Sequence, residues 1–375
     1  AIVSERGEIS NHRVATYGLP GWLQGRPRSR VVMEACTQSG AVARAALAAN
    51  HETVVVPGAF VRLIGVGARG IKTDVRDAEA LANASLRNAV LPSSHLRSES
   101  SLYRHELTTA RDALLSARKG LSLRVKAWLR GHLVSVKGRA KTTEFVTAVR
   151  RVAAEEKLQI SLAMEVLLAS YVQLCAQIEI LDAEIEREVE RDPVCQQLMQ
   201  MPGVGPQIVL AFTAQVDDPN RFPTSDHLAS YLALVPGEAT TGGKVVRCGT
   251  IKAGPAHLKS LLIQGAWSMW RARPNDPIVV WARAIADKRG KRIAVMALAR
   301  KTATILWSMW KHGGPYNPAL ASSARAAPVS PPPSTPLAPS KQRQASVVVD
   351  ESTTTTQAAP DSKGKKRTRT RSSAA

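Results

Sequence analysis

The sequence predicts an α/β domain at the N-terminus, a helical middle region and a mainly helical C-terminal domain. Three observations predict this order: β-branched runs that alternate with Ala-rich stretches, a long heptad seam, and Gly/Pro turns between helical segments. With 375 residues the chain is long enough for several domains. We expect domains at residues 1–96, 97–192 and 193–318. A disordered basic tail is expected at 319–375, where Pro, Ser, Thr and Ala predominate and cannot bury a core.

In the first region, strand and helix signals alternate along the chain. Residues 30–33 and 53–56 are short β-branched runs, typical of strands. The Ala-rich stretch 40–50 lies between them and predicts a helix, and a second helix is predicted at 75–91, before Pro92. Strands that alternate with helices predict an α/β sheet.

The middle region is expected to be helical throughout residues 101–191. Its apolar positions follow one another at spacings of three and four residues, which is a heptad seam: Met164, Leu167, Tyr171, Leu174, Ile178, Leu181 and Ile185. Two interpretations remain open, an antiparallel hairpin within one chain and a coiled coil that joins two chains.

Residues 193–312 are also predicted to be mainly helical, with Gly/Pro loops at 202–206, 236–243 and 313–315. Residues 288–310 predict one basic helix with an apolar face. Five tryptophans in this region are expected to pack in its core: Trp267, Trp270, Trp281, Trp307 and Trp310.

The charge is strongly positive and is arranged in blocks. Lys and Arg number 51 against 30 Asp and Glu, so the net charge is +21. Residues 97–150 contain 12 basic and 4 acidic residues, net +8, and residues 259–320 contain 11 and 2, net +9. Residues 151–192 are acidic, net −6, and the tail contributes +6. This excess predicts a polyanionic partner, nucleic acid or an anionic membrane face.

Several classes of protein are excluded on composition. The 4 cysteines form no C-x-x-C pair, which argues against a disulfide framework or a zinc knuckle and suits a reducing cytoplasm. The eight histidines form no metal-binding pattern, and His105, His132 and His257 are expected to be surface or hydrogen-bonded residues. No apolar run approaches the roughly 20 residues of a membrane span, and the first residues contain no apolar signal-peptide core.

The first candidate site consists of three carboxylates. Glu34 follows a predicted strand, and Asp74 and Asp77 are spaced three apart at a helix start, where they share one face. Sites in α/β sheets form at the carboxyl ends of strands, and carboxylate oxygens suit Mg²⁺. Two such ions can stabilise the attacking and leaving oxygens of a phosphodiester displacement. The alternative is structural, with Asp74 as an N-cap and Asp77 as a first-turn acid.

The second candidate is the turn Pro202-Gly203-Val204-Gly205 between two helical stretches. P-G-x-G between helices is typical of a helix–hairpin–helix, whose glycines permit close backbone approach. The N–H groups of its second helix can hold a DNA phosphate. An ordinary helix–turn–helix corner remains the alternative.

The third candidate is a loop with hydroxyls, glycines and lysines. Thr240 and Thr241 precede Gly-Gly-Lys244, and Lys252 follows in I-K-A-G. A hydroxyl beside two glycines and a lysine could be a nucleophile near phosphate, although such a segment is most often a turn.

The motifs follow one another in an order that resembles one family. From the N-terminus they read V-V-M-E-A, V-V-V-P and G-I-K-T-D-V-R-D-A-E-A-L-A; later come M-P-G-V-G-P, R-F-P-T-S-D-H-L-A-S-Y-L-A-L-V-P-G, T-T-G-G-K, I-K-A-G-P-A-H-L-K-S-L-L and A-V-M-A-L-A-R-K-T-A-T-I-L-W. This series is similar to the DEDD transposases of bacterial insertion sequences, the group that includes Piv-type DNA invertases and bridge-RNA-guided recombinases. The resemblance extends over residues 1–318 and leaves out the tail.

The resemblance implies a RuvC-like, RNase-H-type N-terminal domain, a coiled-coil insertion and a C-terminal transposase domain. It implies that acids in the first domain bind Mg²⁺, and Glu34, Asp74 and Asp77 match three of the family's four. It also implies a serine nucleophile that links covalently to DNA, a homo-oligomer (dimer or tetramer) and, in some members, a structured guide RNA. The implied location is the bacterial cytoplasm, at the nucleoid, without a membrane partner.

The sequence departs from the family at three places. The family's first aspartate has no counterpart, because the chain is expected to start just past it, and neither Glu5 nor Glu8 replaces it. Thr240 or Thr241 stands where the family has serine, and Cys248 stands where glycine is usual. The added methyl of threonine restricts χ1 and crowds the approach to the hydroxyl.

Three functions are therefore compared. The first is a transposase or recombinase that cleaves and transfers DNA strands with Mg²⁺ and a C-terminal hydroxyl. The second is a nucleic-acid-binding remnant without catalysis, which the charge and the departures also fit. The third is a RuvC-like structure-specific nuclease that forms no covalent intermediate.

Overall fold

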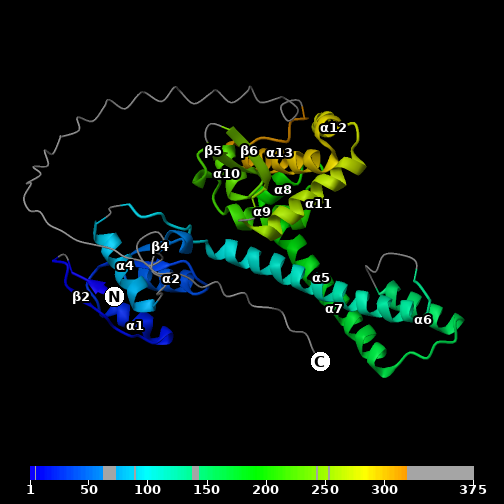
Figure 1. Ribbon diagram of the computed structural model, residues 1–375, viewed down its shortest axis with the longest axis horizontal. Coiled ribbons are helices and arrows are strands. Elements are labelled where there is room, and N and C mark those ends of the chain that lie inside the picture. Colours follow the sequence, from blue (N-terminus) through cyan, green and yellow to red (C-terminus); the bar gives the residue numbers. More distant parts are fainter. Residues whose placement is uncertain are drawn as a thin grey trace, which may run out of the picture. The chain divides into compact units, whose positions relative to one another are not determined.

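The computed structural model describes residues 1–4, 6–61, 73–87, 90–136, 143–241, 244–251 and 254–318. The chain divides into two units, Ala1–Ser323 and Ala324–Ala375, and every element below belongs to the first unit (Figure 1). The expected tail at 319–375 and Lys252 lie outside the described residues.

The N-terminal region is built around a parallel pair of strands. β3 (Arg30–Glu34) lies beside β4 (Glu52–Val56), with Val32 opposite Val54, and α2 (Ser39–Ala48) connects them. The two predicted strands and the helix between them are confirmed. The other elements are β1 (Ile2–Val3), which is antiparallel to β2 (Ile9–Ser10), η1 (Thr16–Gly18), α1 (Leu19–Gln24), α3 (Gly58–Val61) and α4 (Asp74–Arg87).

A small apolar core holds this region together. Val56, Val61 and Leu81 are buried, and side chains of both parallel strands pack against them. α4 contacts β1 and β3, so one face of the strands is covered by the helix that contains the two candidate aspartates. This α/β arrangement is consistent with a RuvC-like fold.

The middle region contains three helices: α5 (Glu99–Gly131), α6 (Glu144–Glu155) and α7 (Leu162–Arg191). It is therefore not helical throughout, because residues 132–136 and 156–161 separate the helices. Ser98 and Ser161 cap α5 and α7 by accepting bonds from the backbone N–H groups of Ser101 and Met164.

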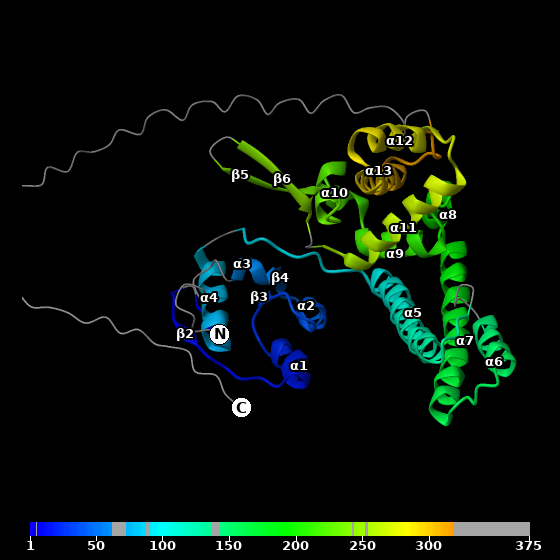
Figure 2. The same cartoon turned by 45° about the vertical axis from the view of Figure 1, so that its right-hand side comes forward.

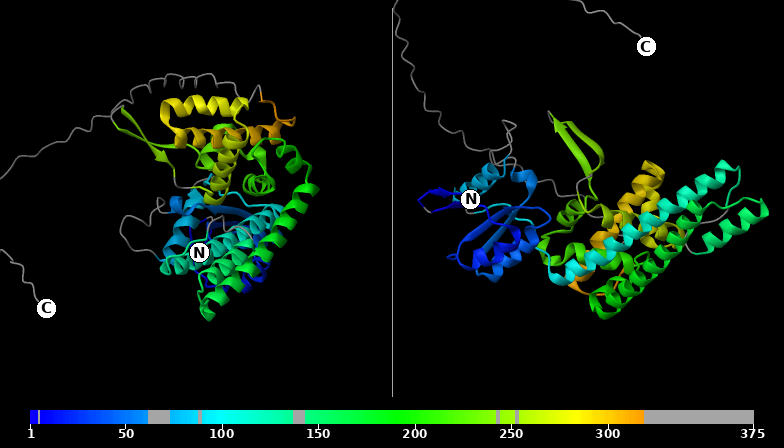
Figure 3. Two further views of the ribbon diagram at one scale, coloured as in Figure 1. Left: turned by 90° about the vertical axis from the view of Figure 1, so that its right-hand side faces the viewer. Right: turned by 90° about the horizontal axis from the view of Figure 1, so that it is seen from below.

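α5 and α7 pack side by side within the chain and run in opposite directions (Figures 1 and 3). Arg104, near the start of α5, forms an ion pair with Asp192 just past the end of α7, at 2.7 Å. Further along, Arg111 pairs with Asp182. Of the seam residues, Tyr171, Ile178 and Ile185 are buried, and the others are half-buried. The described chain thus forms the intramolecular antiparallel pairing; pairing with a second copy stays a prediction.

The expectation that no apolar run approaches the length of a membrane span is wrong by length and composition alone: among the described residues, α7 is the one helix long and apolar enough to cross a membrane. In the structure its N-terminal half packs against α5 and α6 in a common core. That core contains Val125, Leu129, Phe145, Val146, Val149, Leu168, Tyr171 and Cys175.

The C-terminal region is a helical body with one hairpin. Its elements are α8 (Pro193–Leu198), α9 (Pro206–Val216), η4 (Pro219–Arg221), α10 (Ser225–Tyr231), β5 (Pro236–Thr241), β6 (Lys244–Thr250), α11 (Ala256–Ala272), α12 (Pro277–Arg289) and α13 (Lys291–His312). The described residues of α9 from Ile208 to its end are buried, which makes α9 the central helix. The five tryptophans pack in or against this core, as predicted.

Two predictions for this region are wrong. Residues 236–243, expected as a loop, begin with strand β5, which pairs antiparallel with β6. The β-branched run that starts at Val245 favours a strand, and Thr240 lies opposite Val245. Residues 288–310, expected as one helix, are divided at Gly290, whose φ of +86° lies in the left-handed region that glycine adopts readily.

A carboxylate fixes the start of α5 to the end of α9. Asp217, whose φ of 62° ends α9, accepts hydrogen bonds from Ser98 N–H (2.9 Å), Ser98 Oγ (2.5 Å) and His95 Nε2 (2.6 Å). Burial alone would raise the pKa of Asp217, but the bonds from Ser98 and His95 outweigh it, and the pKa lies below its usual value of 3.8.

Replacing Asp217 with Asn is expected to lower the free energy of unfolding by about 1–3 kcal/mol, because charge-assisted bonds are lost while Asn keeps the unusual backbone angle. The stability that the carboxylate provides is present above pH 3.8 and is lost as the pH falls through the lower pKa of the folded protein. Urea unfolding at pH 7 and at pH 3 measures it, with the exposed Asp287→Asn as the control. An equal loss at both pH values would contradict this account.

Candidate functional site

Glu34 lies at the carboxyl end of β3, opposite Val56 of β4, and is half-buried. Its carboxylate lies directly over the backbone of Gly58, the first residue of α3. A Cβ added at Gly58 would come within 2.7 Å of Glu34 Oε1. Gly58 thus leaves room for the candidate ligand and is a positioning residue that the sequence analysis missed. The only signal was a Pro-Gly pair directly after the second strand.

Asp74 and Asp77 occupy the first turn of α4 but differ in burial. The cap is Thr73 rather than Asp74: Thr73 Oγ1 accepts from the N–H of Arg76 at 3.4 Å, and its carbonyl accepts from the N–H of Asp77. Asp77 is 8% exposed, whereas Asp74 is exposed. The positive end of the helix dipole stabilises both charges.

The three carboxylates fit Mg²⁺ by donor chemistry, since they offer only oxygen ligands. The packing of α4 on β3 brings the helix of Asp77 against the strand of Glu34. Within the described parts of the chain, however, no three His, Cys, Asp or Glu side chains come together as a metal-ligand group. In the described structure, α4 and β3, which contain the acids, therefore pack together, but the three carboxylates do not form one metal-binding group.

The Pro202–Gly205 turn connects α8 to α9, the order of elements that a helix–hairpin–helix requires. Gly203 has φ of +76°, and a Cβ there would lie 2.9 Å from the carbonyl oxygen of Gly265 in α11. The absence of a side chain at Gly203 therefore allows the turn to pack closely against α11 inside the protein. Gly205 is the N-cap of α9 and provides no side-chain acceptor, so the start of α9 is left without a side-chain cap.

Thr240, Thr241 and Lys244 lie at the far end of the β5–β6 hairpin, where Thr241 is opposite Lys244. The hairpin projects from the helices of the C-terminal region (Figures 2 and 3). The two glycines between the strands lie outside the described residues. Thr240 and Thr241 thus belong to a strand where a loop was expected.

Comparisons with known proteins place both halves of the chain in one class. Residues 2–134 match the model of the IS110-type DEDD transposase domain, and residues 195–277 match that of the IS116/IS110/IS902 transposase family. These matches indicate an insertion-sequence transposase, a class of enzymes that cleave and recombine DNA.

Similar proteins span almost the whole described chain. A probable family 20 transposase of Pseudomonas aeruginosa is 30% identical over 78% of this chain and 87% of its own length. The transposase of insertion element IS1111A from Coxiella burnetii is 28% identical (74% and 77%). The transposase of IS1328 from Yersinia enterocolitica is 26% identical (80% and 89%). The chain belongs to the IS110 family of DEDD transposases.

Proposed function

We propose that this chain cleaves and transfers DNA strands, with Mg²⁺ held by Glu34, Asp74 and Asp77 and with Thr240 or Thr241 as the nucleophile. One observation supports this most strongly. The acids lie in the segment that matches the DEDD domain model, and the threonines lie in the segment that matches the second transposase model. The residues proposed for metal binding and those proposed for nucleophilic attack thus belong to the two segments by which the family is recognised.

The proposed step is a transesterification. The threonine hydroxyl oxygen attacks a backbone phosphorus, its proton is lost, and one P–O bond of the strand breaks, so that the leaving oxygen becomes a hydroxyl. A hydroxyl of another strand then attacks the same phosphorus, the P–O bond to threonine breaks, and the threonine regains a proton. When bound, Mg²⁺ would supply charge stabilisation at the reacting phosphate.

DNA binding is assigned to the basic parts of the chain. The Pro202–Gly205 turn, Lys244 and Lys252 would hold phosphates, and the helical block 97–150 would line the nucleic acid. We expect the chain to act as a homo-oligomer in the cytoplasm at the nucleoid. A coiled-coil contact between copies and a structured RNA belong to the same proposal.

A covalent adduct tests the proposal. The full chain is incubated with Mg²⁺ and with DNA from the end of its element, and the protein–DNA product is digested and mapped by mass spectrometry. We expect DNA on Thr240 or Thr241, and none when both are replaced by Val. Cleavage without an adduct would indicate the hydrolytic nuclease, and binding without cleavage would indicate the non-catalytic alternative; each would contradict the proposal.

A further inference from the structure

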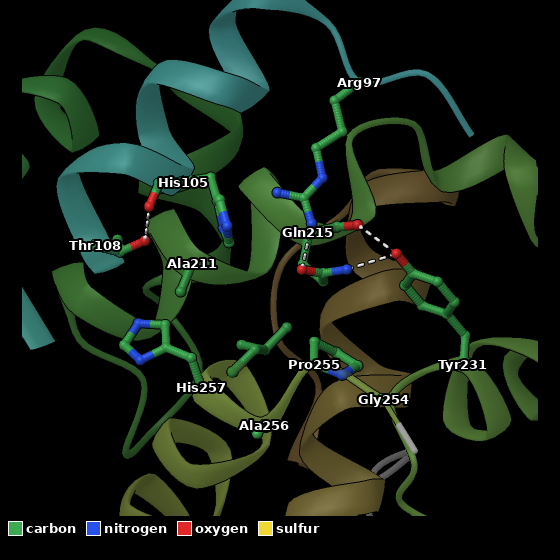
Figure 4. Close-up of a pocket in the computed structure, with 11 residues that line it drawn as sticks. Arg97, His105, Thr108, Ala211, Gln215, Tyr231, Gly254, Pro255, Ala256 and His257 are labelled. Atoms are coloured by element: carbon green, nitrogen blue, oxygen red, sulfur yellow. Dashed lines mark hydrogen bonds between the residues drawn. The ribbon is translucent and has the colours of Figure 1, made fainter. Parts of the chain in front are cut away.

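A cavity of about 580 Å³ lies among α5, α9, α10 and the start of α11, and none of the proposed catalytic residues lines it (Figure 4). One arginine, two histidines and uncharged polar side chains line it, and none of its described lining residues is Asp or Glu. The polar and charged residues that line it are Arg97, His105, Thr108, Gln215, Tyr231 and His257. A cavity that contains a guanidinium and no lining carboxylate suits an anion.

Arg97 is held in position by a short chain of hydrogen bonds. It donates from Nη2 to Gln215 Oε1 at 2.8 Å, and Gln215 Nε2 donates to the hydroxyl of Tyr231 at 2.5 Å. The remaining N–H groups of Arg97 have no partner among the described residues. The guanidinium is therefore preorganised and keeps donors for a ligand, and its planar fork suits phosphate oxygens.

Two histidines lie on neighbouring walls, His105 on α5 and His257 on α11. Burial lowers the pKa of His105, and the positive charges of Arg97 and His257 lower it further, while Glu106 opposes this. His257 Nδ1 lies 3.6 Å from Asp112 Oδ2. Its Nε2 is buried without a hydrogen-bond partner among the described residues. A buried polar atom without a hydrogen bond lowers the stability of the folded protein unless a ligand or water binds it.

The start of α11 also faces this cavity. Pro255 is its N-cap and offers no side-chain acceptor, and Pro255, Ala256 and His257 line the wall. The positive end of a 17-residue helix therefore adds to the field of Arg97.

We propose that this cavity binds one phosphate of the DNA backbone and anchors the strand on which the hairpin acts; the inference rests on the proposed function. The cavity lies at the base of the β5–β6 hairpin, because β6 ends at Thr250 and α11 begins at Ala256. The 7 residues of β6, at about 3.4 Å each, separate base and tip by about 24 Å. This corresponds to about seven base pairs of duplex DNA.

The first test measures affinity. A fluorescently labelled duplex that extends beyond this spacing on both sides is titrated with the full chain at several salt concentrations, and anisotropy gives Kd. We expect Arg97→Gln to weaken binding by on the order of tenfold and to lower the slope of log Kd against log salt by about 1. Arg97→Lys should keep the slope, because the charge remains. Arg13→Gln, an exposed site in the N-terminal region, is the matched control and should leave both values unchanged.

The second test observes the cavity without DNA. Inorganic phosphate is added to full-length protein with labelled histidines, and the imidazole signals are followed by NMR between pH 5 and 8. We expect phosphate to raise the pKa of His105 and to move the signal of His257, and to do neither in Arg97→Gln. If Arg97→Gln binds the duplex as tightly as the wild type, and the histidine signals of the wild type do not respond to phosphate, the inference is wrong and the proposed function is unaffected. A wild-type chain that binds no duplex contradicts the proposed function and the inference together.

Discussion

Replacing Glu34 with Gln is expected to lower the rate of strand transfer by more than about hundredfold and to leave the affinity for DNA nearly unchanged. Loss of a direct metal ligand should lower the rate by more than the 10- to 100-fold that is typical when an outer-shell partner of a metal site is lost. Gln has the same shape and fits over Gly58 equally well, but its neutral amide oxygen is a weaker ligand for Mg²⁺ than a carboxylate. Strand transfer on a labelled duplex, with anisotropy on the same duplex, separates the two effects.

Glu52→Gln is the matched control for this experiment. Glu52 begins β4 and so lies at the other end of the parallel pair, where it forms an exposed ion pair with Arg30 at 3.0 Å. Exposed pairs contribute little to stability, so we expect this variant to behave as the wild type. Gly58→Ala should reproduce part of the Glu34 effect, because its Cβ would displace the carboxylate. Unchanged transfer in Glu34→Gln would exclude Glu34 as a ligand.

Replacing Gly265 with Ala is expected to destabilise the C-terminal body by about 2 kcal/mol, although Ala is the better helix former by about 1 kcal/mol. A Cβ at this position in α11 would lie 2.7 Å from Ile208 Cδ1 and 2.8 Å from the carbonyl oxygen of Gly203. The isoleucine can move, but the backbone of the turn cannot move without displacing α9. Tryptophan fluorescence during urea unfolding measures the change, since the five tryptophans pack in or against this core.

Gly120→Ala is the control for Gly265→Ala. Gly120 lies inside α5, and a Cβ there meets nothing within 4 Å. Only helix propensity then operates, and it should stabilise the chain by about 1 kcal/mol. The two substitutions are chemically identical and are expected to have opposite signs. A stabilising Gly265→Ala would show that the turn and α11 do not pack closely in solution.

The sequence predicted those features that depend on local periodicity. The strands at Arg30–Glu34 and Glu52–Val56 follow from runs of valine, and the order of the candidate acids followed from a resemblance that the family matches confirm. The β5–β6 hairpin was missed because the Thr-Thr-Gly-Gly segment was interpreted as a loop, although the Val-Val run after Lys244 favoured a strand.

Features that depend on contacts between distant residues could not be predicted in this way. Nothing in the sequence indicates that Gly203 meets Gly265, or that Gly58 leaves room for Glu34. His105 and His257 were set aside as ordinary histidines, because neither has a metal-binding spacing. They line one cavity only because α5 and α11 both pack near α9. The burial of Asp77 beside an exposed Asp74 likewise follows from how α4 lies on β3.

The antiparallel pairing of α5 with α7 also changes what the net charge of +21 means. It brings α5, in the basic block 97–150, beside α7, in the acidic block 151–192, and the pairs Arg104–Asp192 and Arg111–Asp182 join the two blocks. Part of that block's formal charge is therefore balanced within the chain, whereas residues 259–320 are net +9 and contain 2 acidic residues of their own. Added salt therefore has two effects at once: it screens the ion pairs between the two blocks of this chain, and it screens the attraction of the chain to DNA.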